Sequence, residues 1–347
     1  MANSLSFAQV KPGEPQFIGP IDYQLPPPMS DEEKLRLELA ERIETPIEVP
    51  QLLFKSYLLP HLKKTGNTQY TSLKEVGDNQ SLEGWLLLEI ERAMQYNELN
   101  YAADLHNLLA CEYFRLGNVE NSFNFFERAL LLKTELKAMD DISLIQFNIG
   151  KAYEFMEDYP CALNTFSNVL SHAKRTGNKL EQLYASMHMA SIKAKGGSYF
   201  EAERDLIHHI LPGFKSLRSK RGENGRIEAY IVLSQVYLLQ DRYPETQWFL
   251  LQAREIVEKE GLNQWMPEIV FNLAQTKKES GNYDIALLEY EMAQEMAEEK
   301  DLLVMQLAIQ EAMGHIYNEA GQFKEALEAL NRYDSLKNQI ISMEYPQ

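Results

Sequence analysis

Few side chains in this sequence stand at spacings that support catalysis or metal binding. The one adjacent histidine pair is His208-His209, but consecutive residues on a helix point about 100° apart and cannot easily share a metal ion. We expect one of these two histidines to be buried. Acidic pairs such as Glu298-Glu299 are spaced as solvated helix faces. The sequence contains no glycine-rich phosphate loop, Cys-x-x-Cys, His-Glu-x-x-His or nucleophile elbow. We therefore expect a protein that is not an enzyme and needs no cofactor or metal.

Side chains that recur at a fixed spacing are more informative. A small residue returns at steps of 40, with one step of 44, at Ala110, Gly150, Ala190, Ser234, Ala274 and Gly314. Nine residues after each comes a larger apolar residue: Val119, Tyr159, Tyr199, Tyr243, Tyr283 and Phe323. Further small and large positions follow at Ser122 and Phe126, Ala162 and Phe166, Ala202 and Leu206, Thr246 and Leu250, Ala286 and Tyr290, and Ala326 and Leu330. Neither helix of such a unit can bury its apolar face alone, so the pattern predicts stacked helix-turn-helix units.

These columns resemble the tetratricopeptide repeat family over roughly residues 102–336. The resemblance is carried by Leu109-Ala110-Tyr113-Ala129, Ile149-Gly150-Tyr153-Ala162-Phe166 and Met313-Gly314-Tyr317-Ala326. Departures from the family pattern are Lys193, Lys277, His209 and Tyr333. The long unit resembles the extended subtype of kinesin light chains, spindle-orientation adaptors and Rap-type bacterial regulators. The resemblance implies an all-α, right-handed solenoid of helical hairpins with a helical N-terminal cap, but it fixes function only to a class.

The domain organisation follows from this pattern. Residues 1–29 are rich in proline and are expected to form a disordered tail. Residues 30–98 are expected to form a helical N-terminal block or a degenerate repeat. Its first helix should start at the Ser30 capping box, and two more are expected near Gln51–Leu62 and over Leu82–Asn97. Six repeats follow within residues 102–336, at about 102–140, 141–180, 181–224, 225–264, 265–304 and 305–336. Residues 337–347 hold the end of a capping helix and a tail.

The longer step between the third and fourth units coincides with an unusual local sequence. Pro212-Gly213 is expected to end a helix early. The one basic cluster of the chain follows at Lys215, Arg218, Lys220, Arg221 and Arg226. We expect a protruding loop near Ser216–Gly225, either a plain solvated insertion or a contact for an acidic partner or for nucleic acid.

Composition restricts the class of partner. The chain of 347 residues is 45% hydrophobic and 24% charged, with a net charge of -17. Such a charge disfavours nucleic acid and weakly favours basic or mixed-charge proteins. Cys111 and Cys161 lie on different units and are expected to be reduced thiols. Neither a signal peptide nor a membrane span is apparent, so we expect a cytoplasmic protein; its oligomeric state is not predicted.

The first helix of each unit should line the concave side of the solenoid, and a partner should bind there. In the extended-repeat adaptors that this chain resembles, an Asn before the apolar-small pair clamps the backbone of an extended peptide; here those residues are Asn148 and Asn272. An amide suits that role because it offers a donor and an acceptor together. The candidate partner-binding set is Asn107, Phe147, Asn148, Lys151, His188, Gln235, Phe271, Asn272, Gln275, Lys278, His315 and Asn318.

Two functions remain open from the sequence. The first is a non-enzymatic scaffold or adaptor that holds an extended peptide or a partner helix in the concave groove. The alternative is a Rap-like, peptide-responsive regulator in which residues 30–98 act on a response regulator or another signalling protein.

Overall fold

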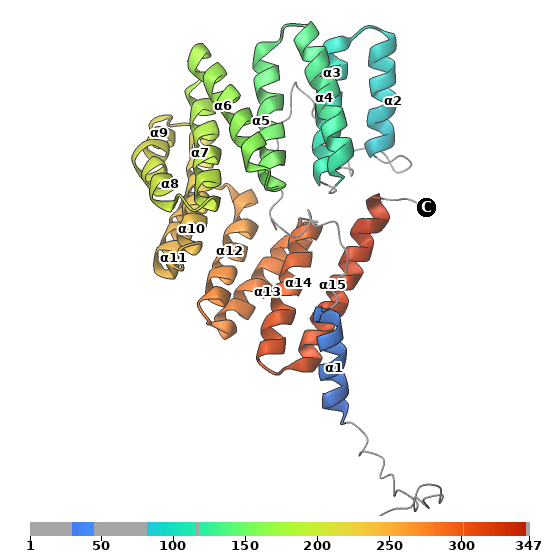
Figure 1. The fold of residues 1–347 in the computed structure, drawn as a ribbon, viewed down its shortest axis with the longest axis vertical. Helices are drawn as coiled ribbons and strands as arrows, with labels where there is room; N and C mark the ends of the chain where they lie inside the picture. Colours follow the sequence, from blue (N-terminus) through green and yellow to red (C-terminus); the bar gives the residue numbers. More distant parts are fainter. Residues whose placement is uncertain (1–29, 45–81, 116–117, 301, 345–347) are drawn as a thin grey trace, which may run out of the picture.

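The computed structural model describes residues 30–44, 82–115, 118–300 and 302–344. The predicted proline-rich tail and the predicted helix near residues 51–62 lie outside this part of the chain. All regular structure in the described residues is helical, which confirms the predicted all-α class. Figure 1 shows the helices stacked in a curved array whose first and last units lie on the same side of the molecule.

The array is built from helix pairs in chain order. The first helices of the pairs are α3 (Leu99–Arg115), α5 (Met139–Phe155), α7 (Lys179–Lys195), α10 (Lys220–Leu238), α12 (Met266–Glu279) and α14 (Leu303–Glu319). Their partners are α4 (Val119–Glu135), α6 (Tyr159–Thr176), the helix formed by α8 (Tyr199–Asp205) with α9 (Leu211–Ser216), α11 (Tyr243–Glu260), α13 (Tyr283–Glu299) and α15 (Phe323–Glu344). Each pair packs mainly on itself and then on the next pair.

The small and large columns meet at the contact within each pair. A Cβ atom at Gly150 would lie 2.9 Å from Cε1 of Phe166, so only glycine lets α5 and α6 approach this closely. In the first unit, Ser122 donates a hydrogen bond of 2.8 Å to the carbonyl oxygen of Ala110. The small and large residues of the repeat columns are thus the packing surface of each hairpin, as their spacing predicts.

The starts of the second helices follow the local sequence. Asp158 caps α6 by accepting a hydrogen bond from the backbone N–H of Cys161 at 3.1 Å. Pro160 and Pro244 lie in the first turns of α6 and α11, where a backbone N–H would have no helical partner.

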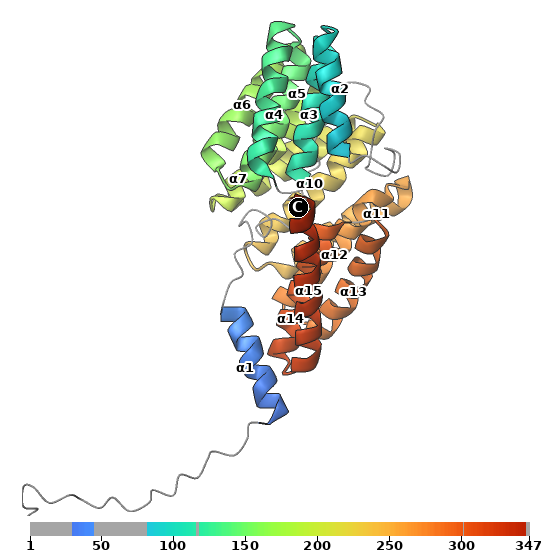
Figure 2. The ribbon, with the colours of Figure 1, turned by 90° about the vertical axis from the view of Figure 1, so that its right-hand side faces the viewer.

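Two helices cover the two ends of the array. Helix α2 (Leu82–Gln95) packs on α3 at the beginning, whereas α1 (Asp31–Glu44) packs on α15 at the end, as Figure 2 also shows. The predicted capping box starts α1: the N–H of Glu33 donates to Oγ of Ser30 at 3.2 Å, and the N–H of Ser30 donates to the Glu33 carboxylate at 2.9 Å. Leu39 of α1 is buried. The described parts of residues 30–98 therefore lie at opposite ends of the solenoid.

The predicted loop at residues 216–225 is wrong, and so is the prediction that Pro212-Gly213 ends a helix. A π-helical turn, Leu206–Ile210, joins α8 to α9, and Pro212 lies in the first turn of α9. The wider turn lets the helix continue past a residue that cannot donate an N–H. Ser219 then caps α10 by accepting from the N–H of Gly222 at 3.1 Å. Most of the four extra residues lengthen the start of α10.

Glycines explain why this segment is helical although its sequence resembles a loop. Gly222 and Gly225 are one helical turn apart on α10 and face Phe214 of α9. A Cβ at Gly225 would overlap the Phe214 ring, which is fully buried. These glycines therefore permit close helix packing and do not mark a turn.

The expectation that one residue of the histidine pair is buried is also wrong. His208 and His209 are both exposed. They lie within the π-helical turn, which rotates this segment relative to a regular α-helix and directs Leu206 and Ile210 into the core instead.

Candidate protein-binding surface

The concave side of the array is identified by a contact between units that are not neighbours in sequence. Nζ of Lys151, on α5, lies 3.4 Å from Oε1 of Glu228, on α10. The two residues belong to the second and fourth units, and α7 of the third unit lies between their helices. A contact that skips one unit is possible only where the solenoid curves inward. We call the surface around Lys151, Glu154, His188, Lys195 and Glu228 the inner wall.

A charge network occupies this inner wall. The Glu154 carboxylate on α5 lies 2.8 Å from Nδ1 of His188 and 3.0 Å from Nζ of Lys195, both on α7. Ser191 donates a hydrogen bond of 2.7 Å to the same carboxylate. Burial opposes ionisation of Glu154, but His188, Lys195 and the hydrogen bonds outweigh burial and hold the pKa of this carboxyl well below its ordinary value. Glu154 therefore stays charged.

His188 connects the two halves of the network. Its Nε2 lies 3.6 Å from Oε1 of Glu228, the same carboxylate oxygen that faces Lys151. The imidazole ring also stacks on Phe166, with ring centroids 5.0 Å apart. Consequently the inner wall joins α5, α7 and α10 through side chains of both signs, which are largely screened from solvent except for the exposed Lys195.

The predicted amide clamp lies deeper than the surface. Asn148 is fully buried, and its Nδ2 donates to Oδ1 of Asn107 at 3.2 Å, close to the Cys111 sulfur at 3.7 Å. Asn272 is 6% exposed, and its amide donates to the carbonyl oxygen of Glu268 at 2.8 Å. In this structure both amides therefore bond within the protein, and Asn148 joins the first unit to the second.

The remaining predicted residues divide by exposure. Phe147 and Phe271 belong to the hydrophobic core. Lys151 and His188 lie in the charge network described above. Five others are half-buried, and three of them stand at the same register, one residue after the small column: Gln235, Gln275, Lys278, His315 and Asn318. Because Lys151 occupies that register too, the half-buried side chains on α10, α12 and α14 continue the line of the inner wall.

Sequence reasoning missed Glu154, Ser191, Lys195 and Glu228. A signal existed for some of them, since Lys151 and Glu154 are one helical turn apart on α5, as are His188 and Ser191 on α7. Nothing in the sequence placed Glu228 opposite Lys151, because the longer start of α10 shifts its register.

No group of three or more His, Cys, Asp or Glu side chains in the described part of the chain is arranged to hold a metal ion. Cys111 is buried and Cys161 exposed, and both are free thiols in this structure. Among the helices that the structure describes, none has the length and apolar character needed to cross a bilayer.

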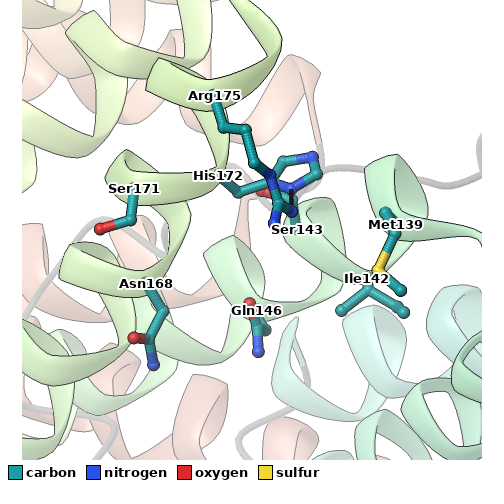
Figure 3. Close-up of a pocket in the computed structure, with 8 residues that line it drawn as sticks. All are labelled: Met139, Ile142, Ser143, Gln146, Asn168, Ser171, His172 and Arg175. Atoms are coloured by element: carbon teal, nitrogen blue, oxygen red, sulfur yellow. Dashed lines mark hydrogen bonds between the residues drawn. The ribbon is translucent and has the colours of Figure 1, made fainter.

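A polar cleft lies away from the inner wall, between the start of α5 and the end of α6 (Figure 3). It has a volume of about 450 Å³. His172 in this cleft bonds to Asp140 through Nε2 at 3.1 Å and accepts from Arg175 through Nδ1 at 3.1 Å. Because a guanidinium can only donate, Nδ1 of His172 is the acceptor and Nε2 is the donor to Asp140, so both basic side chains of the cleft already have partners.

Comparison with known proteins agrees with the geometry. A tetratricopeptide repeat model matches residues 103–135, which cover most of α3 and all of α4. The first hairpin of this array is therefore similar to a tetratricopeptide repeat. The match to the first hairpin and the recurrence of its columns in five further hairpins confirm the predicted fold and the predicted resemblance.

Several solved structures of low sequence identity are similar to this chain. Aspartyl phosphate phosphatase F from Bacillus subtilis is 13% identical over 76% of each chain, with a TM-score of 0.50. A Rap protein in complex with competence and sporulation factor is 14% identical over 78% of this chain and 90% of that chain, with a TM-score of 0.49. A putative kinesin light chain with TPR-like repeats from Podospora anserina is 17% identical over 56% of this chain and 93% of that chain, with a TM-score of 0.42. A search of curated proteins finds no match.

Proposed function

We propose that this protein is a non-enzymatic interaction module that holds an extended peptide or a partner helix along its inner wall. The observation that carries the proposal is the line of polar side chains that successive first helices contribute to one surface, from Lys151 on α5 to Asn318 on α14. Repeat solenoids use such concave surfaces for binding because each unit adds contacts in register with the last.

The chemistry of the wall favours a polypeptide over a nucleic acid. Carboxylates and amines alternate across α5, α7 and α10, and the whole chain carries a net charge of -17. Half-buried amides at Gln235 and Gln275 can each donate to and accept from a peptide group. A nucleic acid would meet excess negative charge over most of the surface.

The proposal is tested with substitutions on the wall that leave the packing intact. Gln275→Ala with Lys278→Ala removes two half-buried side chains of α12, whereas Asn164→Ala with Lys174→Ala changes two exposed residues of α6 as a matched control. We expect affinity purification to lose the partner of the full chain with the first pair and to keep it with the second. If both double variants still retain the partner and their circular dichroism is unchanged, the result would count against binding at the inner wall.

In this proposal, Asn148 and Asn272 do not contact the partner directly. Because both amides bond within the protein, we propose that they position the helices of the inner wall. Replacing them would then change partner binding indirectly, by moving these helices. The Rap-like regulator remains a prediction from the sequence, since much of residues 30–98 lies outside the described chain.

A further inference from the structure

Large apolar side chains are exposed on the second helices of the fourth and fifth units. On α11 these are Trp248 and Leu251, 53% and 42% exposed. On α13 they are Ile285, Leu288 and Met292, which are 47%, 61% and 45% exposed and recur at the spacing of one helix face. We call these five residues the α11–α13 patch. Single exposed apolar residues are ordinary, but several on successive turns of one helix face, as on α13, favour an interaction surface.

The repeats themselves provide an internal control for this patch. Trp248 and Leu288 each stand five residues after the first residue of their helix. At the same position, the second helices of the other four units carry Asn124, Asn164, Arg204 and Glu328. The fold therefore accepts a polar residue here, and packing within the solenoid does not require the tryptophan or the leucine.

The two helices of the patch are close enough to act as one surface. Glu289 of α13 interacts electrostatically with both Arg254 of α11 and Lys277 of α12. Lys277 also donates a hydrogen bond of 2.9 Å to Gln247, the neighbour of Trp248. Polar contacts through α12 thus link the two helices that carry the patch.

The border of the patch is acidic. Helix α13 contains six carboxylates and no basic residue within Tyr283–Glu299. Asp284, Glu291 and Glu295 of this helix are all exposed. A second copy of this chain would bring two such borders together, and an anionic bilayer would be repelled in the same way.

We propose that the α11–α13 patch docks an amphipathic helix whose apolar face is flanked by lysine or arginine. The apolar stripe of α13 supplies the anchoring contacts, and the carboxylates of the same helix pair with the flanking cations. This inference is independent of the inner wall, because the residues involved differ.

Trp248 makes the test direct. It is the exposed tryptophan among the described residues, since Trp265 is buried and Trp85 half-buried. The probe is a synthetic helix of about 18 residues with leucine on one face and lysine on the other. We expect this peptide to shift the emission of Trp248 to the blue and to protect it from acrylamide, and we expect both signals to vanish in Trp248→Phe.

Paired variants separate docking at the patch from general attraction to an acidic protein. Leu288→Gln with Met292→Gln should lower the affinity for the Leu/Lys peptide by about tenfold or more. The control pair, Leu131→Gln with Phe200→Gln, removes exposed apolar residues from α4 and α8 and should leave this affinity unchanged. A matched Leu/Glu peptide should not bind.

Three results would overturn the proposal. Equal weakening by both variant pairs, or equal binding of the Leu/Glu peptide, would show that the patch has no preference for a basic helix. A dimer in sedimentation that the Leu288→Gln/Met292→Gln variant dissolves would show that the patch binds a second copy instead.

Discussion

Lys133 of α4 forms a buried ion pair within the first unit and a second, partly exposed pair with the next unit, and its removal should be severely destabilising. Its side chain is fully buried, with Nζ 2.6 Å from Asp104 of α3 and 2.7 Å from Asp141 of α5. Asn100 accepts a further hydrogen bond at 2.7 Å. Lys133→Ala leaves the Asp104 carboxylate, only 9% exposed, without its cation. Breaking a buried pair in this way costs about 3–5 kcal/mol.

The measurement is the free energy of unfolding from urea titrations followed by circular dichroism. The control is Arg254→Ala, which breaks the exposed pair with Glu258 and should cost no more than about 0.5 kcal/mol. Lys133→Met combined with Asp104→Leu removes both buried charges and should recover most of the loss. If Lys133→Ala costs as little as Arg254→Ala, burial of the pair does not govern its contribution and the reasoning fails.

The remaining predictions concern packing and acid sensitivity. Gly150→Ala should destabilise the fold by about 1–3 kcal/mol because its new Cβ meets the Phe166 ring, and it should lower the melting temperature more than Gly314→Ala, whose nearest contact is 3.3 Å away on a flexible leucine. Burial, helped by the Arg128 charge, lowers the pKa of His106 to about 4, so the imidazole is neutral when folded. The contribution of His106 to the free energy of unfolding is fully present above about pH 6.5, the pKa of an unfolded histidine, and is lost as the pH falls toward 4. His106→Gln should therefore make the free energy of unfolding fall less over this pH range. An unchanged pH profile would contradict this reasoning.

The fold was largely predictable because its determinants are local and repeated. Gly150, Ala162 and Phe166 stand at spacings that only a helical hairpin can use, and the same spacing recurs in every unit. Pro160 and Asp158 marked the start of α6 for equally local reasons. Repetition averages out the ambiguity of any single helix.

Prediction failed where a local signal had two structural solutions. Pro212-Gly213 and the basic cluster after it indicated a loop, yet the π-helical turn accommodates the proline, and Phe214 of α9 packs closely against Gly222 and Gly225 of α10. The exposure of His208 depended on the same π-helical turn. The decisive contact in each case joins α9 to α10, and a one-dimensional pattern does not contain it.

The candidate site was predicted by register, but not by burial. Lys151 and His188 were predicted to line the concave side, and in the structure both are bonded into a network with Glu154 and Glu228. Whether an Asn such as Asn148 faces a bound partner or a neighbouring unit depends on how tightly the solenoid coils. That curvature is set by the sum of all contacts between units.

The most direct test of the inner wall is photo-crosslinking from single sites in the full chain. A photoreactive amino acid at Gln275, in the register of Lys151, should yield adducts with a partner polypeptide that mass spectrometry identifies. The same group at Asn164, exposed on α6, should yield none. Adducts from Asn164 alone, or none from a series of sites at Gln235, Gln275 and His315, would contradict binding along the inner wall.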